Sequence, residues 1–158
     1  MSQILKVESN IKAVSSYARK VLLHGGVIAF PTDTFYGLGV DPFNQDAVDR
    51  IFKIKGRKKN KPLFLLVSSR EQLETLVKDI TPAHYTLMKG FWPGPLTLLF
   101  EPRSVIPTNL SDGRIGIRQP GNSMTRDLIS AIGQPITAPS ANIEGEAPPT
   151  SAKQVDQS

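Results

Sequence analysis

Apolar positions follow two different periods along this chain, and segments of the two kinds alternate. Where apolar residues recur every three or four positions, as at Ile11, Val14, Ala18 and Leu22, an amphipathic helix is expected. Short continuous apolar runs bounded by Gly, Pro or polar residues favour strands. The pattern predicts helices at residues 11–22, 45–55, 71–77, 82–91 and 123–132, and strands at 27–30, 63–67, 96–100, 115–118 and 136–139.

The helix ends carry local signals. Asn10, Asn44 and Ser69 each precede a helical pattern, where their side chains can accept a hydrogen bond from a first-turn N–H. Gln72 follows Ser69 at the spacing of a capping box. Gly56 closes the second helix, because glycine adopts a left-handed backbone easily. Residues 32–44 contain Gly and Pro and are predicted to be a loop, and the tail from residue 143 is predicted to be loop with at most a short polar helix.

The alternation of strands and helices predicts the α/β class. The run 63–67 is apolar throughout, which indicates a strand buried on both faces. No clear helix separates 96–100 from 115–118, so this pair is expected to be antiparallel and the sheet mixed. A chain of 158 residues has the size of one ordinary domain, so residues 1–158 are taken as a single domain.

Composition excludes several classes of protein and site. Apolar residues make up 39% of the chain and charged residues 21%, as in globular proteins, and no apolar run approaches the roughly 18 residues of a membrane span. The absence of cysteine excludes disulfides, thiolate catalysis and thiolate metal sites. No basic segment followed by an apolar core opens the chain, so we expect no secretory signal and a cytoplasmic location.

Positive charge is concentrated in one segment. The net charge is +5, and six of the nine residues from Lys53 to Lys61 are basic. Such a run attracts polyanions, although a solvated basic loop has the same composition. Pro62 and an apolar strand follow at once, so the basic loop is held between a helix and a strand.

Polar side chains and cations stand at the ends of these elements. Thr32 and Thr34 directly follow a strand, where ligands of α/β sheets gather, although a capped turn would also explain them. Lys55 and Arg57 stand at a helix C-terminus, where the helix dipole alone would favour cations. An arginine there can also hold a phosphate or a carboxylate through two hydrogen bonds.

Two further segments offer candidate ligand contacts. Arg118 ends a strand and shares a face with Arg114, so a basic facet and a surface ion-pair partner are both open interpretations. Ser140 and Asn142 follow a buried strand, without the G-x-S-x-G pattern of a nucleophile elbow. They suit hydrogen bonding to a ligand better than attack on one.

Other familiar catalytic patterns are missing. His24 and His84 lack any triad-like context and are predicted to be helix-surface histidines, which makes a serine hydrolase improbable. No P-loop is present, and Gly37-Leu38-Gly39 is too short for a dinucleotide fingerprint. Trp92 is predicted to anchor a turn or the core.

Five segments together resemble the YrdC-like family. They occur in the family's order and at similar spacing, and they cover most of residues 20–150; their most specific parts are the Lys-x-Arg and Ser-x-Asn patterns. The segments are GGVIAFPTDTFYGLG, AVDRIFKIKGRKKNKPL, FWPGPLTLLF, IGIRQP and PITAPSANIEGEAPPT.

The resemblance implies a twisted mixed β-sheet flanked by helices, with a wide basic concave face. It also implies threonylcarbamoyl-AMP synthase activity, in which L-threonine, bicarbonate or CO₂, and ATP give L-threonylcarbamoyladenylate and pyrophosphate. A separate transferase complex then places the threonylcarbamoyl group on an adenosine of certain tRNAs. Mg²⁺ is expected to arrive with ATP and to be held by the nucleotide and water, without a dedicated protein site.

The resemblance implies roles for particular residues. Thr34 and Arg118 would bind threonine, with Thr32 lining the same loop. Lys55 and Arg57 would contact the ATP phosphates. The implied catalytic residues are Lys55, Arg57, Ser140 and Asn142, and the implied nucleotide contacts are Arg57, Lys61, Arg114, Ser140 and Pro148.

Some positions depart from the long members of this family. Leu66, Lys61 and Pro148 stand where those members tend to have histidine, asparagine and serine. The short, stand-alone bacterial type often matches this chain there, so we expect a short synthase without an extra C-terminal domain. The family's domain normally continues past the Ser-Ala-Asn segment, so we expect a fragment or a natural shortened member.

Three other functions compete. A non-catalytic module binding tRNA or double-stranded RNA would suit the +5 charge and the basic run. A carbamoyl-transfer domain of hydrogenase maturation proteins ranks lower, because those domains sit in long chains with cysteine-rich zinc modules. A paralogue of unknown role often lacks the Lys-x-Arg or Ser-x-Asn residues, which are intact here.

Overall fold

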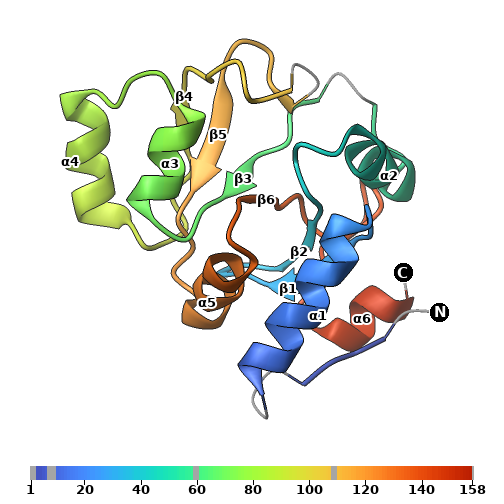
Figure 1. The fold of residues 1–158 in the computed structure, drawn as a ribbon. Helices are drawn as coiled ribbons and strands as arrows, with labels where there is room; N and C mark the ends of the chain where they lie inside the picture. The colour runs from blue at the N-terminus through green and yellow to red at the C-terminus, as the bar shows by residue number, and fades with distance from the viewer. Residues whose placement is uncertain (1–2, 7–9, 59–60, 108–109, 158) are drawn as a thin grey trace.

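The structure is a computed structural model that describes residues 3–6, 10–58, 61–107 and 110–157. Within these ranges, each helix and strand that the sequence predicts is present, although the strands near residues 65, 98 and 136 are shorter than predicted. One further strand lies at residues 36–39, and a short C-terminal helix ends the described chain (Figure 1). The helices are α1 (Ile11–Leu23), α2 (Gln45–Lys55), α3 (Arg70–Leu76), α4 (Pro82–Phe91), α5 (Ser123–Ile132) and α6 (Ala152–Gln157). The strands are β1 (Ile28–Pro31), β2 (Tyr36–Gly39), β3 (Leu65–Leu66), β4 (Leu98–Phe100), β5 (Ile115–Arg118) and β6 (Ile136–Thr137).

The predicted capping residues cap their helices. Asn10 Oδ1 accepts a hydrogen bond from Ala13 N at 3.0 Å, and the side chain of Asn44 caps α2 in the same way. Gly56 ends α2 with φ of 59°, in the left-handed region. Ser69 caps α3, but the Gln72 side chain accepts from the backbone of Ser68 and not from that of Ser69. The capping-box prediction is therefore right for one of its two bonds.

The main sheet is mixed, as predicted. Its order is β4-β5-β3-β6; β3 and β5 are parallel, and the other two pairs are antiparallel. Both residues of β3 are fully buried on opposite faces. Leu65 packs in a core with α2, α3, β4 and β5, and Leu66 packs in a second core with α1 and α5. The prediction of a strand buried on both faces is confirmed.

The prediction that residues 32–44 form a loop is wrong, because β2 lies inside this range and pairs antiparallel with β1. Gly37 and Gly39 are strand residues beneath the ring of Phe30. A Cβ on Gly39 would lie 2.8 Å from Phe30 Cε1, and one on Gly37 would lie 3.3 Å from Phe30 Cζ. These glycines therefore permit close packing of an aromatic ring on a strand. Residues 32–35 and 40–44 stay outside the strands, on either side of β2.

Thr137 joins the two sheets. Its hydroxyl is fully buried, donates to Leu38 O and accepts from Val40 N, both at 3.1 Å. Further along, Leu38 N donates to Pro139 O at 2.8 Å. The segment after β6 is thus held beside β2, which places residues 139–142 against residues 36–40. Among the described helices, none is long and apolar enough to cross a membrane.

Candidate functional site

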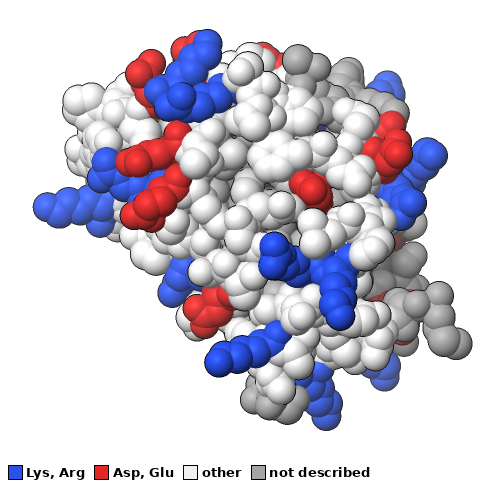
Figure 2. Space-filling view, viewed as in Figure 1, with Lys and Arg blue, Asp and Glu red and all other residues white. Residues whose placement is uncertain are grey.

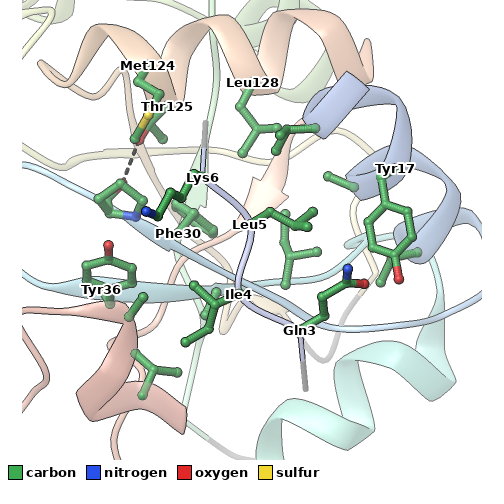
Figure 3. A pocket seen from close by; sticks show the side chains of 18 of the residues that line it. Gln3, Ile4, Leu5, Lys6, Tyr17, Phe30, Tyr36, Met124, Thr125 and Leu128 are labelled. Atoms are coloured by element: carbon green, nitrogen blue, oxygen red, sulfur yellow. Dashed lines mark hydrogen bonds between the residues drawn. The ribbon is translucent and has the colours of Figure 1, made fainter. Parts of the chain in front are cut away.

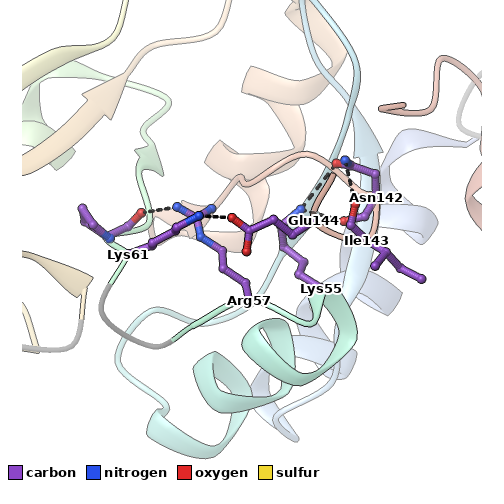
Figure 4. A network of polar contacts seen from close by, with 7 residues as sticks. Lys55, Arg57, Lys61, Asn142, Ile143 and Glu144 are labelled. Atoms are coloured by element: carbon purple, nitrogen blue, oxygen red, sulfur yellow. Dashed lines mark hydrogen bonds and ion pairs between the residues drawn. The ribbon is translucent and has the colours of Figure 1, made fainter. Parts of the chain in front are cut away.

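Lys55 forms the centre of the candidate site. It is the last residue of α2 and only 2% exposed, and its ammonium group points at the segment after β6 (Figure 4). Nζ donates to Ser140 O at 2.5 Å, to Asn142 O at 2.7 Å and to Asn142 Oδ1 at 3.4 Å. The structure therefore brings together the Lys-x-Arg and Ser-x-Asn patterns, which are 85 residues apart in the sequence.

Asn142 holds the loop that carries it. Its Nδ2 donates to Ile143 O at 3.0 Å and to Glu146 O at 2.7 Å, while its Oδ1 faces Lys55. Glu144 N donates to Lys55 O at 2.8 Å. Side-chain and backbone hydrogen bonds together fix residues 142–146 to the end of α2. We call residues 142–146 the clamped loop.

Arg57 and Lys61 lie beside the clamped loop. Arg57 Nη2 donates to Pro62 O at 3.1 Å, and its buried Nε finds no hydrogen-bond partner among the described residues. Lys61 forms an ion pair with Glu144 (Figure 4). Lys59, which belongs to the predicted basic run, lies outside the described residues. One carboxylate therefore lies within a group of three cations.

Electrostatics at this cluster follow from burial and from charge. Burial lowers the pKa of the Lys55 ammonium, the Arg57 guanidinium lowers it further, and the Glu144 carboxylate opposes both. The hydrogen bond from Lys61 lowers the pKa of the Glu144 carboxyl, and the charges of Lys61, Arg57 and Lys55 add to this effect. Glu144 is therefore ionised at neutral pH.

The two threonines of the 32–35 turn differ. Thr32 Oγ1 donates to Phe35 O at 2.6 Å and accepts from Thr34 N at 3.2 Å, as in a capped turn. The Thr34 hydroxyl lies 3.3 Å from that of Thr32, on an exposed residue. The Thr32 hydroxyl therefore stabilises the turn, and the Thr34 side chain is the one exposed to solvent.

Arg118 is held beside this turn. Its Nε and Nη2 donate to Thr97 Oγ1 at 3.1 and 3.0 Å, and its guanidinium carbon lies 5.0 Å from the centre of the Phe64 ring. Burial lowers the pKa of Arg118, and the Asp33 carboxylate raises it. Asp33 Oδ2 also accepts from Gly121 N at 2.7 Å, which ties the turn to the segment after β5. The structure therefore brings the threonine turn and Arg118 together.

β2 connects the two halves of the site. Tyr36 O accepts from Ala141 N at 2.8 Å, and Tyr36 N donates to Pro149 O at 2.9 Å. Ser140 and the half-buried Pro148 thus lie close to the start of β2, next to the 32–35 turn. Sequence patterns did not indicate these backbone contacts, because they join segments about a hundred residues apart.

Arg114 lies elsewhere. It is exposed and stands just before β5. The hydrogen bond and the charge of Lys78 lower the pKa of the Glu101 carboxyl, and the charge of Arg114 adds a smaller effect. Arg118 is at the other end of the same strand, four residues further on. At the rise per residue of an extended strand, this corresponds to about 13 Å. The structure does not place Arg114 with the other site residues, although its predicted role in nucleotide binding stays a prediction.

The histidines and Trp92 have structural roles. His24 Nδ1 lies 2.7 Å from Lys20 O at the end of α1, and His84 takes part in the capping box of α4 and stacks on Phe100. Trp92 Nε1 donates to Leu96 O at 2.7 Å, so Trp92 anchors a turn as predicted. Within the described ranges, no group of three His, Cys, Asp or Glu residues is arranged to hold a metal ion.

A cavity of about 910 Å³ lies between α1, β1, α5 and α6 (Figure 3). Ile4 and Leu5 cross it, and Thr125 donates to Pro31 O at its edge at 2.5 Å. Its lining includes none of the cations of the candidate site.

On the face drawn in Figure 2, Lys and Arg side chains are interspersed with Asp and Glu and do not form a continuous basic patch.

Residues 20–158 match the protein family Sua5/YciO/YrdC, which carries the description telomere recombination. Threonylcarbamoyl-AMP synthases from Pyrococcus abyssi and Bacillus subtilis are both 41% identical, over 94% and 87% of this chain. The chain spans only 43% and 41% of those relatives. A putative threonylcarbamoyl-AMP synthase from Methanocaldococcus jannaschii is 33% identical, over 99% of this chain and 75% of the relative.

Solved structures agree with the sequence matches. The crystal structure of Pyrococcus abyssi Sua5 complexed with L-threonine has a TM-score of 0.88 at 40% identity, covering 92% of this chain and 44% of that one. Escherichia coli YciO has a TM-score of 0.82 at 25% identity, covering 92% of this chain and 72% of that one. The five segments identified in the sequence therefore predicted the family correctly: the chain belongs to the Sua5/YciO/YrdC family.

Proposed function

We propose that this chain carries the catalytic site of a threonylcarbamoyl-AMP synthase, a nucleotidyltransferase that acts in tRNA modification. The observation that carries this proposal is the contact of Lys55 with Ser140 and Asn142, which assembles a cation cluster beside a turn bearing hydroxyl groups. The similarity to a Sua5 protein crystallised with L-threonine supports threonine as the substrate.

In the proposed reaction the threonine amine first forms a carbamate, either by adding to CO₂ with loss of a proton or by condensing with bicarbonate with loss of water. An oxygen of the resulting carbamate then attacks the α-phosphorus of ATP, and the bond to the bridging oxygen of the leaving pyrophosphate breaks. Both reactants are anionic, so fixed cations must offset their repulsion, and positioning supplies much of the rest.

The described residues suit separate parts of this task. Arg118 would hold the threonine carboxylate beside Thr34, through the N–H groups of the guanidinium that do not bond Thr97. Arg57 would donate its buried, unpaired Nε–H to a phosphate oxygen. The bond from Lys55 Nζ to Asn142 Oδ1 is the longest of the three at 3.4 Å, so a phosphate oxygen would replace it most easily.

Magnesium would accompany the nucleotide and neutralise phosphate charge. Phosphate oxygens and water would hold the ion, because Mg²⁺ prefers oxygen ligands and keeps several of its waters. The proposed partners are ATP, L-threonine and bicarbonate or CO₂, with a threonylcarbamoyl transferase complex acting downstream in the cytoplasm.

The test is pyrophosphate release from ATP with bicarbonate and magnesium, with and without L-threonine. Threonine-dependent release that Arg57→Ala abolishes is expected, while Arg19→Ala, an exposed change on α1, leaves it intact. Failure of the folded protein either to release pyrophosphate or to bind L-threonine would contradict the proposal. Salt-dependent tRNA binding without turnover would instead support the RNA-binding module.

A further inference from the structure

Glu144 is an anion inside a cluster of cations that the sequence linked to phosphate binding. It forms an ion pair with Lys61, and its charge also acts on Arg57 and Lys55. Figure 4 shows these side chains converging from α2, from the segment after it and from the clamped loop. Without Glu144, three positive charges would face one another at a site where two of the side chains are partly or fully buried.

The backbone of Glu144 is fixed, but its side chain is not enclosed. Glu144 N is bonded to Lys55 O, and Asn142 holds the loop on either side. The Glu144 and Lys61 side chains are 35% and 51% exposed. Exposed ion pairs are weak, so the carboxylate can leave its partner at little cost while the loop stays in place.

We propose that Glu144 is a built-in competitor for the phosphate groups of the ligand: its carboxylate neutralises part of the cation cluster in the free protein, and a polyphosphate displaces it. This inference rests on the proposed function, since it assumes that Arg57 and Lys61 meet phosphate. With three cations and one carboxylate, the cluster carries a charge of +2 in the free protein and offers +3 once the carboxylate swings away. Glu144 would therefore set how tightly polyphosphates bind.

The test is the affinity for inorganic tripolyphosphate, measured by calorimetry at low salt without magnesium. Glu144→Gln keeps the size of the side chain and removes its charge, and it is expected to tighten binding about two- to fivefold, the upper part of the range for release of one exposed ion pair. Glu146→Gln is the matched control. It makes the same charge change in the same loop, but within the described part of the chain Glu146 forms no ion pair. We expect less than a twofold effect from it.

The possible results separate this inference from the proposed function. If tripolyphosphate binds, Arg57→Ala weakens it and Glu144→Gln has no larger effect than Glu146→Gln, the inference on Glu144 is wrong and the phosphate site stands. If neither the natural protein nor Glu144→Gln binds tripolyphosphate, both are wrong. The measurement is then repeated with magnesium. If Glu144→Gln weakens tripolyphosphate binding only when magnesium is present, the carboxylate contacts the metal, and its role as a competitor is wrong.

Discussion

Replacing Lys55 by methionine should destabilise the protein by about 2–4 kcal/mol. The substitution keeps the apolar stem and opens no large cavity, but it removes the ammonium group that satisfies the backbone oxygens of Ser140 and Asn142. A buried acceptor without a partner costs about 1–3 kcal/mol, so two give at most about 2–6 kcal/mol, and access of water to these part-buried oxygens lowers this cost. Relief from burying the ammonium charge offsets part of this loss, because burial already lowers the pKa of Lys55.

Denaturant unfolding followed by the fluorescence of Trp92, the single tryptophan, measures this loss. At about 2–4 °C per kcal/mol for a protein of this size, the melting temperature should fall by roughly 4–16 °C. Lys53→Met is the matched control on the same helix, where the side chain is exposed, and it should change stability by less than about 0.5 kcal/mol. Equal stability of the two variants would show that Lys55 does not hold the clamped loop.

Three other predictions follow from local contacts. Thr137→Val removes the hydroxyl that joins the sheets through two buried bonds, so it should cost about 2–4 kcal/mol in chemical denaturation, whereas a loss below 1 kcal/mol would mean that this link is dispensable. Gly90→Ala in α4 meets no atom within 4 Å and should stabilise the protein by about 0.5–1 kcal/mol, seen as a higher melting temperature; a lower one would refute this. Lys61→Met should raise the pKa of Glu144 toward the ordinary value in an NMR titration, because the hydrogen bond from Lys61 is the main cause of its lowering; an unchanged pKa would contradict the ion pair. Since the folded pKa lies below the unfolded one, the pair contributes stability above about pH 4.3 and loses it as pH falls through the folded pKa.

Sequence patterns that extend over only a few neighbouring residues were enough to predict most helices and strands. Asn10 and Asn44 cap helices through a hydrogen bond from the backbone N–H three residues further on to the asparagine side-chain oxygen. Because both partners lie in the same short segment, the cap does not depend on tertiary contacts. Gly56 ends α2 because of its own backbone preference. The strand at Leu65 and Leu66 was also predictable, since apolar residues on both faces require cover from both sides.

β2 was missed because its glycines have a tertiary cause. Gly37 and Gly39 resemble loop residues in the sequence, yet they leave space for Phe30 on the neighbouring strand. Asp33 was equally ambiguous. Its carboxylate accepts a hydrogen bond from Gly121 N, 88 residues away in the sequence. No short-range pattern distinguishes these cases.

The basic run shows the same limit at the site itself. Counting charges from Lys53 to Lys61 predicts an affinity for polyanions, but the consequence of each charge depends on partners far along the chain. Lys55 is buried under the backbone of residues 140–142, and Lys61 is paired with Glu144, 83 residues away. Only Arg57 keeps a buried donor without a partner among the described residues. The three cations therefore differ in their contacts. Lys55 holds the loop, Lys61 is paired with a carboxylate, and Arg57 has a buried Nε–H that no described residue accepts. Substituting them one at a time should separate stability, polyphosphate affinity and turnover.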